Sequence, residues 1–321
     1  MTDYKSFAEE IQNSGEYNGL VLFDEQMKKH TTFKIGGAVP VFFEPADMDS
    51  LLVLLKLIKE KSVNFFILGG GSNIVFCDDG FDGIVVSMLK INEIQCHSVE
   101  DKETNPKGNV FLVTCGAGTT MAQFVNFCTQ NQLTGAEQFA GLPGTLGGAL
   151  FMNARCFDRS ISDLFVEAYY IRLSDYTEQH ATFKASEWDY KKSPFQNSNT
   201  LLLSVTLHLE KTEKSPAEIE EKNRYYIGER KSKGHFDFPS AGSVFRNNHD
   251  FGAPSGKIID ECGLRGYKTG GAQVAPFHGN FIINIGGATQ KDVKALVEYV
   301  ENVVREKTGF NLQPEIIFVD K

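Results

Sequence analysis

The chain has 321 residues, 41% of them hydrophobic and 23% charged, and a formal net charge of −9. This length allows one very large domain or two to three ordinary ones with ample core. The acidic balance argues against a nucleic-acid coat or a binder of anionic membranes. Six cysteines contain no CxxC pair, which argues against a zinc site.

Membrane and export signals are also missing from the sequence. The most apolar stretch, residues 51–58, is interrupted by Lys56 and is too short to span a bilayer. The first five residues lack the basic and apolar regions of a signal peptide. We therefore expect a cytoplasmic protein with reduced thiols.

The first predicted elements lead into a glycine-rich turn. Asp47 can cap a helix whose apolar residues recur at helical spacing over 51–58. Residues 65–68 and 74–76 form apolar strands around Gly69-Gly70-Gly71-Ser72-Asn73. Three consecutive glycines exceed what a simple turn needs. A Rossmann motif would open a helix here and a P-loop would end in Lys-Ser/Thr, and neither pattern is present.

The middle of the chain predicts further strands and one capped helix. Residues 84–86 and 110–113 are apolar and β-branched, as in strands, and 99–109 has the composition of an exposed hairpin tip. The segment from Thr119 to Gln132 predicts a helix with a threonine cap.

A second glycine-rich turn spans residues 141–149. Pro143-Gly144-Thr145 resembles a helix start, and 146–154 predicts a helix of small residues. The N-terminus of such a helix offers amides and a positive dipole to a phosphate. Tight packing of helix against sheet explains the small residues equally well, so both interpretations stay open.

Two helices and a strand complete the predicted elements. Residues 215–233 read as a charged helix with proline at its first position. The segment 289–307 is strongly amphipathic and is ended by Gly309, and 316–319 reads as a terminal strand. The irregular alternation of elements favours α+β domains over one wound parallel sheet.

Taken in order, these segments resemble the UDP-N-acetylenolpyruvoylglucosamine reductase family, also called the UDP-N-acetylmuramate dehydrogenase family, of bacterial cell-wall synthesis. The resemblance covers nearly the whole chain. It is carried by His30 to Gly37, Ile67 to Asn73, Asp78 to Gly83, Gly141 to Asn153, Tyr190 to Phe195, Ala241 to Asn247, Gly270 to Val274, His278 to Asn284 and Pro314-Glu315.

The resemblance implies an α+β protein of three domains. Two form an FAD-binding unit of the vanillyl-alcohol-oxidase/PCMH type, expected at 1–87 plus 310–321 and at 88–212. The third, expected at 213–309, binds substrate and is α+β. The short run from Phe195 to Pro239 leaves no room for an extra substrate-gating insertion, so the chain resembles the shorter subtype.

The implied reaction passes hydride from NADPH to FAD and then to an enolpyruvyl ether on a UDP-sugar. Ser243 matches the family's proton donor, and Glu315 matches the carboxyl group that stabilises the enol form. Without the resemblance, each would be read as an ordinary turn or surface residue. From the acidic charge we expect no nucleic-acid or membrane partner, and we favour a monomer.

The sequence departs from the family pattern at two places. The family motif Tyr-Arg-x-Ser reads Tyr190-Lys191-Lys192-Ser193 here, so the fork of arginine is lost. The family's Gly-Ala-Tyr reads Arg155-Cys156-Phe157. We hypothesise that Arg155 reaches the flavin or the substrate carboxylate and shares the catalytic work of Lys191. A pair with Asp158 or Asp163 would explain Arg155 equally well.

The remaining site residues follow from the matched segments. For FAD we expect Lys34, Ile35, Gly69, Gly70, Gly71, Ser72, Asn73, Gly141, Gly144, Thr145, Gly147 and Gly148. For the UDP-sugar we expect Tyr190, Arg246, Asn247, Lys257 and Gln273. His278 is also in a matched segment, where a structural role is the alternative.

Two other functions compete with the reductase. One is an FAD-dependent oxidase on the same scaffold, many of which tether flavin through His or Cys. The other is a catalytically weakened flavin-binding regulatory protein, which only the lysine at 191 supports.

Overall fold

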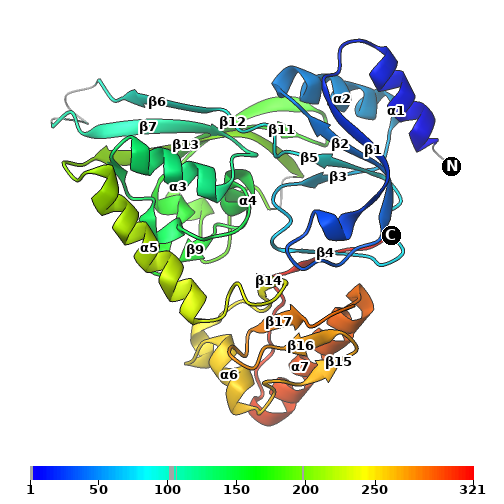
Figure 1. Cartoon of the computed structure of the whole chain (residues 1–321), viewed down its shortest axis with the longest axis vertical. Helices are drawn as coiled ribbons and strands as arrows, with labels where there is room; N and C mark the ends of the chain where they lie inside the picture. The colour runs from blue at the N-terminus through cyan, green and yellow to red at the C-terminus, as the bar shows by residue number, and fades with distance from the viewer. Residues whose placement is uncertain (1–2, 101–104, 106, 197–198) are drawn as a thin grey trace.

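The computed structural model describes residues 3–100, 105, 107–196 and 199–321. Three units of mixed helix and sheet surround a centre where their loops meet (Figure 1). The chain runs through the three units in order, and the last strand returns beside the first unit.

The first unit is a four-stranded sheet covered by two helices. Asp47 accepts a hydrogen bond from the Ser50 amide and so starts the second helix, as predicted. Its buried residues, Leu51, Leu54 and Ile58, lie on one face at helical spacing. The sheet has the order β1 (Gly19–Gln26), β2 (Ala38–Pro45), β5 (Ile84–Ser87) and β3 (Phe65–Leu68), with α1 (Tyr4–Asn13), the 3-10 turn η1 (Met27–Lys29) and α2 (Met48–Lys61) beside it.

A separate parallel pair ties the C-terminus to this unit. Strand β18 (Ile317–Val319) pairs with β4 (Ile74–Phe76), directly after the first glycine turn. The predicted strand–turn–strand over 65–76 and the predicted terminal strand are therefore confirmed.

The second unit is an antiparallel sheet packed against short helices. The predicted helix with a threonine cap is confirmed as α3 (Met121–Gln130), which begins with a capping box of Thr120 and Gln123, one residue after the expected Thr119. The sheet has the order β12 (Thr177–Thr182), β11 (Phe165–Arg172), β13 (Thr200–Lys211), β7 (Val110–Gly116) and β6 (Ile94–Ser98), with β8 (Leu133–Thr134) on β13, and η2 (Glu137–Phe139), α4 (Leu146–Phe151), η3 (Ile161–Asp163) and η4 (Ala185–Glu187) around it.

The helix α4 is shorter than the predicted segment 146–154. Asn153 adopts a left-handed backbone with a φ of 41°, which ends the helix. The chain then forms a small hairpin of β9 (Arg155–Cys156) and β10 (Arg159–Ser160). In the expected hairpin tip, residues 101–104 and 106 lie outside the described residues.

The long helix α5 (Pro216–Ser232) connects the second and third units (Figure 1). Ser215 and Glu218 form its capping box, with proline at the first position as predicted. The helix packs against η2 and α3 of the second unit. Lys222 donates to the buried Glu137 at 3.2 Å. The expected boundary at 213 places this helix with the third unit, whereas its packing contacts lie on the second.

The third unit packs two helices on a four-stranded sheet. The predicted amphipathic helix is confirmed as α7, capped by Thr289 and ended by a left-handed Gly309. Its sheet and helices are β14 (Ser240–Ser243), β17 (Phe281–Asn284), β16 (Ala272–Val274), β15 (Lys268–Thr269), η5 (His249–Phe251), α6 (Ser255–Glu261) and α7 (Gln290–Thr308). None of the helices within the described ranges combines the length and apolar character needed to cross a bilayer.

Candidate active site

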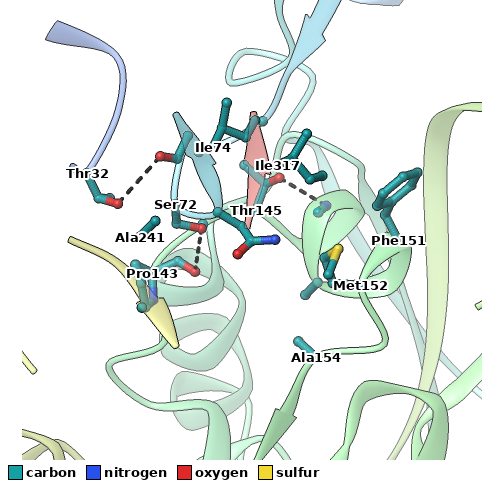
Figure 2. Close-up of a pocket in the computed structure, with 18 of the residues that line it drawn as sticks. Thr32, Ser72, Ile74, Pro143, Thr145, Phe151, Met152, Ala154, Ala241 and Ile317 are labelled. Atoms are coloured by element: carbon teal, nitrogen blue, oxygen red, sulfur yellow. Dashed lines mark hydrogen bonds between the residues drawn. The ribbon is translucent and has the colours of Figure 1, made fainter. Parts of the chain in front are cut away.

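A cavity of about 1540 Å³ lies where the three units meet. Figure 2 shows its wall: Ser72 and Ile74 come from the first unit, Thr145, Phe151 and Met152 from the second, and Ala241 from the third. Cavities for a single small ligand are usually about 300–1,000 Å³. The volume therefore suits a large cofactor and a second ligand together.

The two glycine turns contact each other directly along this wall. A β-carbon at Gly70 would lie only 2.5 Å from the Cα of Gly144, and one at Gly69 would lie 2.6 Å from Thr145 Oγ1. The Ser72 hydroxyl donates to the Pro143 carbonyl at 3.4 Å, one of the dashed lines in Figure 2. Glycine is needed at 69 and 70 because the other turn occupies the space of a side chain.

The first turn also presents free backbone donors. The amides of residues 70–73 have no acceptor among the residues that the structure describes, and all four residues line the cavity. Gly71 holds a left-handed backbone with a φ of 61°, which turns the chain at this point. Successive free amides in a turn form a concave site for an anion such as a pyrophosphate.

The second turn divides its glycines between packing and the cavity. A β-carbon at Gly147 would lie 2.8 Å from that of Ala117, so tight packing against the second sheet explains this glycine. At Gly148 a β-carbon would meet only Thr145 Oγ1, at 3.4 Å, and this residue is exposed in the cavity wall. Both interpretations of the small-residue helix therefore apply, each to a different residue.

Backbone pairing brings Ser243 and Glu315 to the same place, although they are 72 positions apart in the sequence. The Glu315 amide donates to the Val244 carbonyl at 2.7 Å, and Phe245 bridges to Pro314 in antiparallel fashion. Both Ser243 and Glu315 line the cavity. The Ser243 hydroxyl makes no hydrogen bond within the described part of the chain, so it is available to a ligand.

Glu315 also contacts the first glycine turn and the second unit. The Asn73 side-chain amide donates to the Glu315 carbonyl at 3.1 Å. Lys191 Nζ lies 2.7 Å from Glu315 Oε1, and only 16% and 7% of the two side chains are exposed. Asn247 donates to the Tyr190 hydroxyl at 3.3 Å, which joins the same loop to the third unit.

Two family models match this chain. Residues 234–319 match the model described as UDP-N-acetylenolpyruvoylglucosamine reductase, C-terminal domain. Residues 39–171 match the model described as FAD binding domain. The UDP-N-acetylenolpyruvoylglucosamine reductase of Treponema denticola is 41% identical over 311 residues, which is 94% of each chain. The chain belongs to the UDP-N-acetylenolpyruvoylglucosamine reductase family.

More distant members agree with this assignment. The reductase of Bacillus subtilis is 32% identical, over 93% of each chain. The crystal structure of UDP-N-acetylenolpyruvylglucosamine reductase from Thermus caldophilus has a TM-score of 0.70 and 25% identity, covering 94% of this chain and 99% of that one. The predicted family, the α+β fold with an FAD-binding unit and the shorter subtype are confirmed. Family membership also favours the reductase over an oxidase on the same scaffold.

Most residues expected from the family resemblance line the cavity. Besides Ser243, Glu315 and Lys191, these residues are Lys34, Gly69, Gly70, Gly71, Ser72, Asn73, Gly144, Thr145, Gly147, Gly148, Arg155 and Asn247. Arg155 forms no ion pair with Asp158 or Asp163 in the described ranges. Its guanidinium donates to the Ser160 hydroxyl at 3.2 Å, while Asp163 accepts from the Ser160 amide.

Six expected residues lie outside the lining, one of which, Tyr190, reaches the lining residue Asn247. Ile35, the residue after Lys34, is buried in the core, and Gly141 faces the end of α5. Lys257 is exposed and lies 3.7 Å from Glu261. The other two are Gln273, which donates to the Gly266 carbonyl at 2.9 Å, and Arg246, whose carbonyl accepts from Ser255.

Sequence reasoning missed the cavity wall formed by the end of α5 and the loop after it. Arg230, Lys233 and His235 line the cavity there. Burial, aided by Arg230, His278 and Lys233, lowers the pKa of His235 to about 4, so its imidazole is neutral near pH 7. These residues match none of the motifs in the sequence. Only their position shortly before Ser240–Ser243 could have indicated that they line the cavity.

A buried cysteine also lines the cavity beside these cations. Burial raises the pKa of the Cys156 thiol, although Arg230 and Lys191 act in the opposite direction. Arg230 Nη2 lies 2.8 Å from Cys156 Sγ. The thiol is therefore protonated near pH 7 and unsuited to act as a nucleophile.

Proposed function

We propose that the protein reduces UDP-N-acetylglucosamine enolpyruvate to UDP-N-acetylmuramate with NADPH, using bound FAD, in the synthesis of peptidoglycan precursors. The observation that supports this most strongly is the meeting of Ser243, Glu315 and Lys191 in the same cavity as the free amides of residues 70–73. This cavity holds an anion site, a proton donor and an ion pair together.

The FAD is held mainly by backbone groups. The free amides of residues 70–73 bind its pyrophosphate, and the second turn from Gly144 to Gly148 forms the facing wall. FAD bound there would supply the transfer of hydride from NADPH to the methylene carbon of the enolpyruvyl group. The three units exclude water from this carbon by closing around the cavity.

Ser243 supplies the proton for the neighbouring carbon of the substrate. Its hydroxyl is free of other described residues and lines the cavity next to the strand that carries Glu315. A serine is a weak acid, so it needs preorganised charge near the developing enolate. Arg155 provides positive charge at this wall, and Lys191 forms an ion pair with Glu315 that offsets its negative charge.

Substrate binding uses the third unit. Asn247 lines the cavity and holds Tyr190 by a hydrogen bond, which joins the second and third units across the substrate. The lining cations Arg230 and Lys233 extend the positive surface for a nucleotide diphosphate. We expect the protein to act as a cytoplasmic monomer.

An anaerobic experiment with the flavin-loaded protein tests this function. NADPH should bleach the flavin absorbance band, and the enolpyruvyl UDP-sugar should restore it with formation of UDP-N-acetylmuramate, identified by mass. A flavin that stays on the polypeptide after denaturation, or a reduced flavin that only oxygen reoxidises, would contradict the proposal and favour an oxidase.

A further inference from the structure

Two cations of this chain differ from the family pattern, and the structure gives them different surroundings. Position 191 holds lysine where the family motif has arginine, and position 155 holds arginine where the family usually has glycine. We propose that Arg155 takes over the binding of the carboxylate of the enolpyruvyl group, whereas Lys191 positions Glu315. This assignment rests on the proposed function.

Lys191 is already engaged by the protein. Its ammonium lies 2.7 Å from the Glu315 carboxylate, and both side chains are largely buried. Its backbone is left-handed, with a φ of 56°, and its carbonyl accepts from Gln196 at 3.2 Å. A non-glycine residue in this conformation needs support from its surroundings. Lys191 is therefore held in one place with its charge directed to Glu315 rather than free for a substrate.

Arg155 has the opposite properties. It is exposed in the cavity wall, and its described contact is the neutral hydroxyl of Ser160. No acidic side chain lies within ion-pair distance of it among the residues given positions. A guanidinium has five N–H donors in a planar fork, so this contact leaves donors for a two-point bond to a carboxylate.

The other lining cations are less suited to this role. Arg230 donates to Cys156 Sγ and lies over the ring of Phe157, at 5.8 Å from its centroid. Lys233 lies 3.7 Å from Glu229. Lys34 is exposed, but an ammonium gives only a point charge and no planar fork. Of the two arginines that line the cavity within the described residues, Arg230 is held by a thiol and an aromatic ring, whereas Arg155 has neither contact.

Hydrogen bonds hold the segment of Arg155 close to the loop of Lys191. The Asn153 side chain donates to the Asp189 carbonyl at 2.8 Å. Gln196 Nε2 contacts both Met152 Sδ, at 3.7 Å, and the Lys191 carbonyl. Met152 and Ala154 lie together on the wall in Figure 2. These hydrogen bonds join the segment 152–155 to the loop 189–191, and Arg155 lines the same cavity as Lys191 and Glu315.

The separate roles of Arg155 and Lys191 follow from the charge that develops during the reaction. As hydride arrives at the methylene carbon, negative charge builds on the adjacent carbon and spreads into the substrate carboxylate. A guanidinium bonded to that carboxylate stabilises the charge in the transition state. An unpaired Glu315 carboxylate would repel the same charge, and Lys191 cancels this repulsion by holding Glu315 in an ion pair.

Binding and single-turnover measurements on the flavin-loaded Arg155→Ala and Arg155→Lys variants test the first role. Two ligands separate the contributions: the enolpyruvyl UDP-sugar carries the carboxylate, and UDP-N-acetylglucosamine lacks it. Arg155→Ala should bind the first at least tenfold more weakly and slow flavin reoxidation by about a hundredfold. Its affinity for UDP-N-acetylglucosamine and its reduction by NADPH should stay within about twofold of wild type. Arg155→Lys should lie between them.

Lys191→Met and Lys191→Arg test the second role. Lys191→Met should lower kcat for the enolpyruvyl substrate without raising its KM, and Lys191→Arg should restore kcat because it restores the pair with Glu315. The exposed Arg224→Ala on α5 serves as the matched control for loss of an arginine and should behave as wild type.

The opposite pattern would overturn the assignment: Arg155→Ala binding both ligands like wild type, with Lys191→Met raising the KM of the enolpyruvyl substrate alone. Equal weakening of both ligands by Arg155→Ala would also overturn it, because the effect would not depend on the carboxylate. A wild-type enzyme that NADPH reduces but the enolpyruvyl sugar does not reoxidise would instead overturn the proposed function.

Discussion

Gly70→Ala tests whether contact between the two glycine turns builds the FAD site. The added β-carbon would lie 2.5 Å from the Cα of Gly144. Carbon atoms in ordinary contact lie about 3.5–4.0 Å apart. The neighbour is backbone and has no rotamer that relieves the clash, so the turns must separate by about 1 Å.

The cost of this separation divides between folding and cofactor binding. Overpacking of this kind usually destabilises a protein by about 1–3 kcal/mol. If half of that cost, about 0.5–1.5 kcal/mol, appears only when FAD is bound, the affinity for FAD falls by about twofold to tenfold. We expect Gly70→Ala to purify with less flavin, to bind added FAD more weakly in a fluorescence titration, and to unfold at a lower temperature.

Gly228→Ala on α5 is the matched control. A β-carbon there would meet nothing within 4 Å, and the position is exposed inside a helix. Alanine in place of a helical glycine should stabilise the protein by about 0.5–1 kcal/mol and leave the FAD affinity unchanged. Wild-type flavin content and FAD affinity in Gly70→Ala would show that close contact between the two turns is not needed to build the FAD site.

Two further predictions concern stability and are measured by urea unfolding. Glu137→Ala removes the acceptor for the Gly135 amide, at 2.7 Å, and for Lys222, and should lower the free energy of unfolding by about 1–3 kcal/mol. Glu261→Ala, at an exposed position, is the control and should change this free energy by less than about 0.5 kcal/mol. Equal effects of the two substitutions would contradict the role of burial. His235→Gln should lose less stability than wild type between about pH 7 and pH 5. The folded pKa of about 4 lies below the usual 6.5, so in this window the unfolded wild-type chain binds the extra proton. If the free energy of unfolding changed equally with pH in the two proteins, His235 would not contribute to the pH dependence of stability.

Local signals in the sequence predicted the elements that depend on them. The side-chain cap of α2 and a threonine cap for α3 were predicted, because a capping side chain and its partner amide lie within three residues of each other. The start of α5 was predicted from its first-position proline and the end of α7 from Gly309. The strands around the first glycine turn were readable from their short apolar runs. The strands β11 and β13 were not among the predicted elements, although apolar residues recur at every second position of β13. Their place in the sheet is decided by pairing between distant segments.

The site could be predicted in part, and only through the family resemblance. Ser243 and Glu315 look ordinary in the sequence, because an antiparallel pairing between distant segments brings them together. The same limit explains why Lys257, chosen for its charge, lies on the exposed surface. It also explains why the end of α5 was missed as part of the cavity wall. Spacing along the chain does not encode which distant loops meet.

Single-turnover kinetics of Ser243→Ala test whether Ser243 delivers a proton in the cavity next to Glu315. The flavin-loaded variant should be reduced by NADPH at a rate within about twofold of wild type. Its reoxidation by the enolpyruvyl UDP-sugar should be slower by about 10²–10⁴-fold, the usual contribution of a positioned proton donor. Reoxidation at the wild-type rate would show that Ser243 is not the proton donor.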